Sequence, residues 1–352
     1  MKGTPLFLPG DRVGSWVGAL AGSSTVFGPQ VGSSGRPEFA LVRDPSAVDL
    51  SLDARRASIR ELWMPQTEIL FRYRLDSQGA TLEAVPRPEG SRVAFGIRPC
   101  EAAAIRRVTH VFRQGKHPDP LGLEAEGMAI VGLYCASPRR TCFCAQVGSP
   151  VDMAEEACDV LMTPISGGHV LHVMTDRGGS LAGVSGAAQA TSDQVSAAGA
   201  VHAGLITAVP ADGAIGALEA TALEVWASEV FADQGARCIG CGVCTFLCPA
   251  CHCFDILDER QGTGGARYRC WDSCQFDHFT LHASRHNPRH DQAARLRQRV
   301  LHKFLYMPQE FGVTGCTGCG RCAELCPVGI SIRQVVADVR AAMAQEQGVT
   351  VA

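Results

Sequence analysis

The chain has 352 residues, 46% of them hydrophobic and 19% charged, so it is long enough for two or three domains with real cores. Its 32 Lys and Arg residues nearly balance its 35 Asp and Glu residues, which excludes the strongly basic surface of a nucleic-acid-binding protein. Cysteine is over-represented: there are 17, twelve of them between Cys238 and Cys326 and none in the first 99 residues. Because an odd number of cysteines in a long chain without a convincing secretory signal argues against a disulfide scaffold, we expect a cytoplasmic protein whose reduced thiols hold metal.

The first half of the chain is expected to form a mixed α/β domain over residues 1–185. The uncharged run from Val13 to Gly35 has too many Gly and Ser residues for a membrane span, and we interpret it as loop and short strand. A helix is predicted from Pro99 to Val111, with proline at its start. Four β-rich runs bounded by turn residues predict strands at Phe39–Val42, Ile69–Tyr73, Arg92–Ile97 and Ala129–Tyr134.

The middle of the chain, residues 186–236, is predicted to be a linker followed by a helix. From Gly178 to Gly213 the composition shifts to Ala, Gly and Ser, which is typical of a linker or a lightly packed helical segment. Apolar and acidic residues then alternate at helical spacing from Ala214 to Gln234, and this predicts an amphipathic helix that ends just before the cysteine-rich region.

The cysteine-rich region contains the same motif twice, 78 residues apart. Both copies fit C-x2-C-x2-C-x3-C-P, the bacterial ferredoxin pattern for [4Fe–4S] clusters. Small residues between the cysteines allow tight turns whose backbone N–H groups can point at cluster sulfurs, and we expect Gly240, Gly242, Gly318 and Gly320 to have this role. The first copy supplies Cys238, Cys241, Cys244 and Cys248, and the second supplies Cys316, Cys319, Cys322 and Cys326.

The proline after each fourth cysteine directs that thiol to the other cluster. One cluster is therefore predicted to take Cys238, Cys241, Cys244 and Cys326, and the other Cys316, Cys319, Cys322 and Cys248. Zinc is the alternative occupant, but a zinc site needs two separated pairs of ligands and has no use for a repeated third cysteine and C-P.

Residues 237–352 are thus expected to form a ferredoxin-like dicluster domain with an insert at residues 254–314. A helix is predicted at residues 291–306, so the insert is expected to be helical, and a further helix is predicted at residues 330–346 after the second motif. The fold class is α+β. No dinucleotide-binding fingerprint is present, since the glycine-rich run at residues 262–267 does not fit the required spacing.

Eight motifs follow one another in a specific order from about residue 60 onward. They are MPQTEILF at 64–71, GIRPCEAAAI at 96–105, YCASPRRTCFC at 134–144, CPACHCFDI at 248–256, WDSCQFDHF at 271–279, HNPR at 286–289, RLRQRVLHKF at 295–304 and CTGCGRCAELCPVGI at 316–330. On these motifs, which cover most of the chain, the sequence resembles the β subunit of soluble [NiFe] hydrogenases, or sulfhydrogenases, a pattern shared with the electron-transfer subunit of anaerobic sulfite reductases.

The resemblance implies a non-catalytic electron-transfer subunit of a cytoplasmic complex. In that family the subunit is similar to a conduit between a flavin- and NAD(P)H-binding partner and a catalytic hydrogenase partner, or a sulfite reductase partner in the alternative complex. A self-contained enzyme, whose N-terminal domain binds its own flavin or substrate, is a hypothesis of another class. Neither nucleic acid nor membrane is an expected partner.

A second group of cysteines is a candidate for a third iron–sulfur cluster. Its centre is Cys135, Cys142 and Cys144 with Cys100, and it could be completed across a domain interface by Cys251, Cys253 or Cys274. The alternative is that these thiols are buried and pack like small apolar groups. Cys158 is expected to be such a bystander.

Three further patterns of charged or metal-binding residue types stand out in the sequence. The segment from Arg285 to Lys303 holds six basic residues and one acidic residue, so it is either a docking or potential-tuning patch or a solvated helix. Cys and His residues recur every four residues from Cys270 to His290, and we expect them to lie on a helix face and in turns rather than to form a metal site. Arg98 and Glu101 are expected to form a salt bridge at a helix start.

Overall fold

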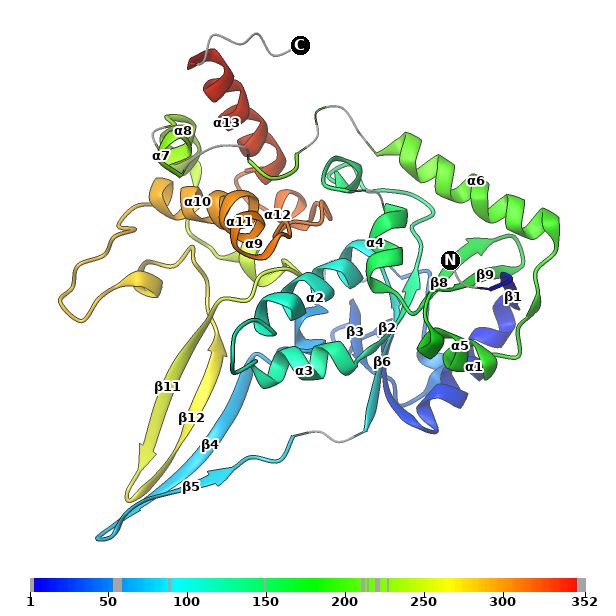
Figure 1. Cartoon of the computed structure of the whole chain (residues 1–352), viewed down its shortest axis with the longest axis horizontal. Coiled ribbons are helices and arrows are strands. Elements are labelled where there is room, and N and C mark those ends of the chain that lie inside the picture. Colours follow the sequence, from blue (N-terminus) through cyan, green and yellow to red (C-terminus); the bar gives the residue numbers. More distant parts are fainter. Residues whose placement is uncertain are drawn as a thin grey trace.

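The structure is a computed structural model. It describes residues 3–52, 59–87, 90–148, 150–209, 213, 215–218, 222–226 and 228–346. Helices and two β-sheets are combined in one chain, as expected for an α+β protein (Figure 1).

An eight-stranded sheet organises the N-terminal half, in the order β10-β1-β9-β8-β7-β6-β2-β3. The neighbouring pairs from β2 through β6 and β7 to β8 are parallel, and the remaining pairs are antiparallel. Strand β7, with the sequence AIVGL, is buried along its whole length, as is typical of a parallel strand covered on both faces. The strands are β1 (Leu6–Pro9), β2 (Ser24–Val31), β3 (Pro37–Leu41), β6 (Ser91–Ile97), β7 (Ala129–Leu133), β8 (Val160–Ile165), β9 (Gly168–Val173) and β10 (Ala188–Gln189).

Helices cover the two faces of this sheet and bury separate cores. Strand β6 contributes to both, with Phe95 in one core and Ala94 in the other. The Phe95 side is covered by α1 (Val13–Ala21) and α5 (Asp176–Gly183). The opposite side is covered by α2 (Pro99–Phe112), α3 (Pro120–Gly127) and α4 (Pro150–Ala157) (Figure 1).

The interpretation of residues 13–35 as loop and short strand was wrong for its first part. Val13–Ala21 is helix α1, because Trp16, Val17 and Leu20 lie on one face and are buried against the sheet. The Trp16 ring meets Phe95 edge-on, with their centroids 5.1 Å apart. This packing outweighs the low helix propensity of the Gly and Ser residues.

A second sheet joins the N-terminal half to the insert. Its order is β11-β12-β4-β5, so a hairpin of β4 (Thr67–Asp76) and β5 (Gly79–Ala84) pairs with a hairpin of β11 (Phe254–Gln261) and β12 (Gly264–Trp271). The insert therefore contains this hairpin in addition to the expected helix. The glycine-rich run at residues 262–267 forms its turn and the start of β12. In Figure 1 the four strands project from the body of the molecule.

The remaining helices surround the cysteine motifs. The prediction of a single helix from Ala214 to Gln234 was wrong. Residues 215–218 are not helical, and the Leu218 N–H donates to the Phe304 carbonyl. Residues 214, 219–221 and 227 lie outside the described residues. The helix predicted at 291–306 continues through a π-helical turn. The elements are α6 (Ser192–Ala208), α7 (Ala222–Trp226), α8 (Val230–Arg237), α9 (Val243–Phe246), α10 (Gln292–Leu301), the π-helix η7 (His302–Tyr306), α11 (Met307–Phe311), α12 (Arg321–Glu324) and α13 (Ile332–Glu346), with short 3-10 turns η1 (Gly10–Arg12), η2 (Pro45–Ala47), η4 (Ile59–Leu62), η5 (Cys144–Gln146) and η6 (Asp277–Thr280).

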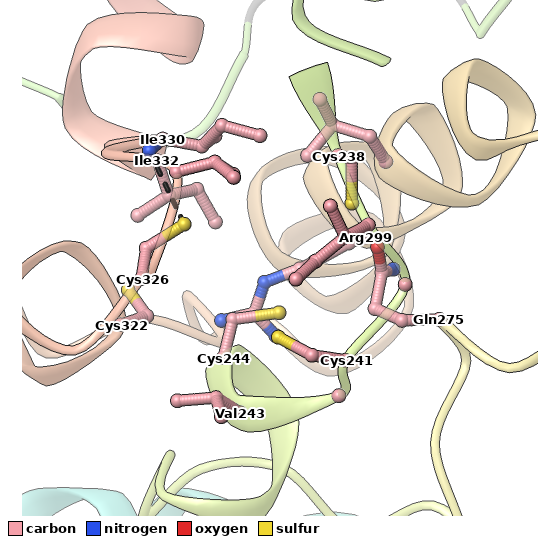
Figure 2. A pocket seen from close by; sticks show the side chains of 15 residues that line it. Cys238, Cys241, Val243, Cys244, Gln275, Arg299, Cys322, Cys326, Ile330 and Ile332 are labelled. Atoms are coloured by element: carbon pink, nitrogen blue, oxygen red, sulfur yellow. Dashed lines mark hydrogen bonds between the residues drawn. The ribbon is translucent and has the colours of Figure 1, made fainter. Parts of the chain in front are cut away.

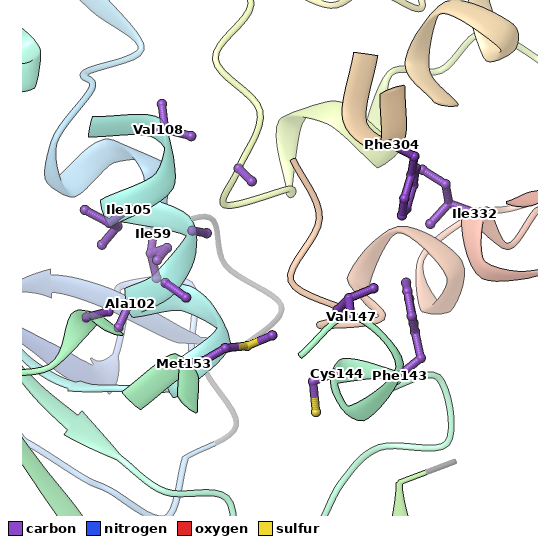
Figure 3. Packing of buried hydrophobic residues seen from close by; sticks show 14 of the residues in the cluster. Ile59, Ala102, Ile105, Val108, Phe143, Cys144, Val147, Met153, Phe304 and Ile332 are labelled. Carbon is purple, nitrogen blue, oxygen red and sulfur yellow. The ribbon is translucent and has the colours of Figure 1, made fainter. Parts of the chain in front are cut away.

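The larger buried core contains residues from both halves of the chain. Phe143, from the loop before α4, points toward Phe304 of η7 and Ile332 of α13 (Figure 3). The cysteine motifs are therefore packed directly on the N-terminal half. No helix in the described part of the chain is long and apolar enough to cross a membrane.

Candidate iron–sulfur centres

The two cysteine motifs have matching backbone geometry. Gly240 and Gly242 have φ of +66° and +72°, and Gly318 and Gly320 have φ of +64° and +74°. This left-handed region is open to glycine at little cost, which confirms the tight turns expected at these four positions. Gly242 and Gly320 each precede a short helix, α9 and α12, that carries the third cysteine of its motif.

The first motif lines a cavity that we call the first cavity (Figure 2). Its thiols are Cys238, Cys241 and Cys244 of the first motif together with Cys322 and Cys326 of the second, whereas Cys248 is not in its wall. The Ile330 N–H donates to Cys326 Sγ at 3.2 Å. The other walls are mainly aliphatic and include Leu296, Val328, Ile330 and Ile332.

The second motif lines a neighbouring space, the second cavity. Its thiols are Cys316, Cys319 and Cys322 of the second motif together with Cys248 of the first, whereas Cys326 is not in its wall. The Gly318 N–H donates to Cys316 Sγ at 3.4 Å. Each cavity thus receives the fourth cysteine of the other motif, and Cys322 is a wall common to both.

Two buried cations of the basic segment lie among these thiols. Arg299 and Lys303 are each 3% exposed, and Arg299 lines both cavities. Arg299 Nη1 lies 3.2 Å from Cys251 Sγ, and Lys303 Nζ lies 3.5 Å from Cys248 Sγ. This face of the segment is therefore neither a solvated helix nor a docking patch: its positive charges are directed inward.

The electrostatics of the site are dominated by sulfur and these cations. Burial alone would lower the pKa of Arg299, but the neighbouring Cys244 and Cys251 side chains raise it well above its usual range. Burial likewise opposes the charge of Lys303, and Cys248 and Cys251 reverse the effect, so its pKa is also raised. Both side chains therefore stay charged and can compensate the negative charge of an iron–sulfur cluster.

The cysteines of the insert lie near these cations. The thiols of Cys253 and Cys274 are hydrogen-bonded to each other, and this bond lowers the pKa of Cys274. The Cys251 carbonyl accepts a bond of 3.2 Å from Arg60. None of these three cysteines lines the cavity formed by the N-terminal group, so the structure does not bring the seven candidate cysteines of a third site together.

The N-terminal cysteines do converge. Cys100, Cys135, Cys142 and Cys144 line a third cavity, and Cys319 of the second motif completes its wall. Cys158 lies elsewhere, packed under β7, where a Cβ on Gly132 would come within 2.5 Å of its Sγ. It is a buried packing residue, as expected.

The salt bridge expected between Arg98 and Glu101 is not formed. The Glu101 carboxylate accepts the Arg98 backbone N–H at 2.7 Å, which caps α2, and it forms its ion pair with Arg321 of the second motif. The Arg98 guanidinium is directed at the carbonyls of Leu133 and Tyr134. No local pattern pointed to the partner of Glu101, which is 220 positions away.

The Cys and His residues at four-residue intervals do not form a metal stripe. Cys270 lies on strand β12, and between it and α10 the chain has only the 3-10 turn η6. Among the described residues, no three His, Cys, Asp or Glu side chains are placed to hold a single metal ion. Cysteine groups around cavities, with backbone N–H groups aimed at sulfur, suit a polynuclear cluster.

The fold and the paired motifs define an iron–sulfur protein, and residues 237–330 match the family of 4Fe-4S dicluster domains. The chain is similar to sulfhydrogenase 2 subunit beta of Pyrococcus furiosus, with 29% identity over 259 residues, which cover 72% of this chain and 75% of that protein. No solved structure matches. The resemblance to hydrogenase β subunits, the α+β fold class and the electron-transfer character are confirmed.

Proposed function

We propose that the chain relays electrons through two [4Fe–4S] clusters inside a cytoplasmic multi-subunit oxidoreductase. Electrons would enter from a flavin- and NAD(P)H-binding partner and leave to the catalytic subunit of a [NiFe] hydrogenase, or run in reverse. The observation that carries the proposal is the common wall of the first and second cavities at Cys322. Two clusters so placed are close enough for an electron to pass between them.

The lining residues support the crossed ligand assignment. One cluster would be held by Cys238, Cys241, Cys244 and Cys326, and the other by Cys316, Cys319, Cys322 and Cys248. Of these two cavities, the first is lined by Cys326 and not by Cys248, and the second by Cys248 and not by Cys326, as the assignment requires.

The protein contributes the surroundings of the clusters. Iron–sulfur clusters supply one-electron chemistry, at a potential set by cluster type, net charge, hydrogen bonds to the sulfurs and solvent exposure. Ile330 and Ile332 contribute apolar wall to the first cavity, and the Ile330 N–H stabilises charge on Cys326. Arg299 and Lys303 favour the more negative, reduced state because they place positive charge beside sulfur.

The nature of the catalytic partner distinguishes two versions of the proposal. The similarity to a sulfhydrogenase subunit favours a hydrogenase complex, and an anaerobic sulfite reductase complex is the alternative. Affinity purification of the tagged chain from its native host tests both. Stoichiometric nickel in the complex supports the hydrogenase, sirohaem supports the sulfite reductase, and a chain that purifies alone contradicts the role of a subunit.

A self-contained flavin enzyme is a second candidate because of a fourth cavity of about 680 Å³. It lies at the carboxyl ends of β6, β7 and β8, where open α/β sheets bind ligands. Arg98, His169 and Cys135 are among its lining residues. Flavin bound stoichiometrically to the purified chain, seen as absorbance at ~450 nm after removal of the clusters, would favour this enzyme over a pure conduit.

A further inference from the structure

Four cysteines distant in sequence meet at one edge of the N-terminal sheet. Cys100 follows β6 at the start of α2, Cys135 follows β7, and Cys142 and Cys144 lie in the loop before α4. Parallel neighbours such as β6 and β7 bring their carboxyl ends to the same edge, so the topology itself places Cys100 beside Cys135. All four line the third cavity.

The wall of the third cavity is otherwise without polar side chains. Besides the thiols it consists of three prolines, Met153, Leu205 and the Gly318 backbone. Cys142 and Cys144 are 7% and 9% exposed. A space whose polar side chains are all thiols suits a soft, thiolate-bound metal centre.

The loop that carries Cys142 and Cys144 is fixed against the second cysteine motif. The Phe143 N–H donates to the Gly318 carbonyl at 2.8 Å. A Cβ on Gly318 would lie 2.5 Å from Cys144 Cα, and a Cβ on Gly320 would lie 2.3 Å from the Thr141 carbonyl oxygen. The loop and the motif are in such close backbone contact that only glycine fits at these two positions.

Cys319 connects the second and third cavities. It belongs to the second motif, lines the second cavity and also lines the third. The Cys142 thiol is directed at the Cys319 carbonyl at 3.8 Å. Three thiol-lined spaces therefore follow one another, with Cys322 between the first two and Cys319 between the last two.

We propose that Cys100, Cys135, Cys142 and Cys144 bind a third [4Fe–4S] cluster that extends the relay into the N-terminal half. The proposal rests on the electron-transfer function proposed above. In each step one electron leaves the reduced cluster held by the second motif, which is thereby oxidised, and reduces the third cluster; no proton and no further reactant is required. Cys135 also lines the cavity of about 680 Å³, so the relay reaches the edge of the sheet where a partner or ligand can take the electron.

Chemical analysis of the complete chain, purified without oxygen, tests the proposal directly. Three cubanes require about twelve iron atoms and twelve acid-labile sulfides per chain. A count of about eight of each overturns the third cluster and leaves the two-cluster relay standing. Zinc without sulfide, or markedly fewer than eight iron atoms, overturns the relay as well.

Variants locate the extra iron. Cys142→Ser is expected to remove about a third of the iron and one of three signals in the electron paramagnetic resonance spectrum of the reduced protein. Cys158→Ser is the matched control, since it alters a buried cysteine of the same half outside the cavity, and Cys253→Ser is a control in the insert. Full iron content in Cys142→Ser, or equal losses in Cys158→Ser, would overturn the assignment. If Cys142→Ser does not fold, the iron count of the unaltered chain still decides.

Discussion

Arg321 of the second cysteine motif forms an ion pair with Glu101 of helix α2, and both side chains are almost fully buried, at 1% and 0% exposed. The pair joins the dicluster domain to the helix that begins at Pro99 and carries Cys100. Because both charges have left water, each depends on the other, and neither could be lost without leaving an uncompensated buried charge.

This pair is expected to behave as a unit. Arg321→Met or Glu101→Gln alone should lower the free energy of unfolding by about 3–5 kcal/mol, and the double variant by clearly less than the sum. Urea denaturation followed by far-ultraviolet circular dichroism measures the three values. Additive losses would show that the two side chains do not interact.

Crossed ligation makes a distinctive prediction for Cys248. Although it belongs to the first motif, Cys248→Ser should damage the cluster held by Cys316, Cys319 and Cys322 and leave the cluster at Cys238 largely intact. Cys326→Ser should have the converse effect. Mössbauer and electron paramagnetic resonance spectra of the two variants can be compared; loss of the cluster nearest in sequence in each case would refute the assignment.

The charge of Lys303 is expected to raise the reduction potential of the cluster in the second cavity. Lys303→Met removes a buried positive charge beside Cys248, which disfavours the reduced state by about 1–2 kcal/mol, or roughly 40–90 mV toward more negative potential. Arg297→Met is the control, because Arg297 stacks on Trp226 at 3.7 Å and lines neither cavity. Redox titration of both variants measures the difference, and equal shifts would contradict the local effect.

Alanine substitutions at Gly318 and Gly312 separate two effects on stability. One is the close contact of the second motif with the loop that carries Cys142 and Cys144, and the other is the backbone strain of a positive φ. Both have positive φ, +64° and +69°, so alanine at either costs about 1–2 kcal/mol of stability. A Cβ at Gly312 meets open space, whereas one at Gly318 overlaps the Cys144 backbone. Gly318→Ala should therefore lower the melting temperature clearly more than Gly312→Ala; the same melting temperature for both would mean that the contact is not tight.

Acid sensitivity is expected at His202, which lies outside the cysteine sites. Burial, with His172 nearby, lowers the pKa of His202 to about 4, and its Nε2 lies 2.8 Å from Thr163 Oγ1. In the unfolded chain the pKa of His202 is near 6.5, so the unfolded state binds the proton more readily than the folded state. The contribution of neutral His202 to the free energy of unfolding is therefore complete above pH 6.5 and is lost as the pH falls toward 4.

His202→Gln should remove this dependence. After allowance for partial solvent exposure, the stability difference between wild type and variant should change by roughly 1–2 kcal/mol between pH 7 and pH 5. Urea denaturation at the two values measures it with the clusters present in both proteins. A difference that does not change with pH would show that His202 titrates normally in the folded chain.

The cysteine motifs themselves could be recognised without a structure. Their spacing is local, so the turns at Gly240 and Gly318 and the α+β character follow from short-range patterns. Helix α1 was missed because its Gly and Ser residues have low helix propensity, and only the burial of Trp16 against Phe95 stabilises it. The hairpin of β11 and β12 was missed because its partner, β4, lies far away in the chain.

The amino-acid sequence by itself determined which thiols belong to the two ferredoxin-type motifs and what kind of cofactor suits them, because those ligands lie within a few residues of one another. The tertiary structure decided which of the other cysteines meet. Cys100 and Cys135 converge through the parallel pairing of β6 and β7, Cys319 reaches the same cavity through the packing of two loops, and Arg299 and Lys303 face inward because α10 and η7 are buried. These relationships depend on long-range contacts, which local spacing does not encode.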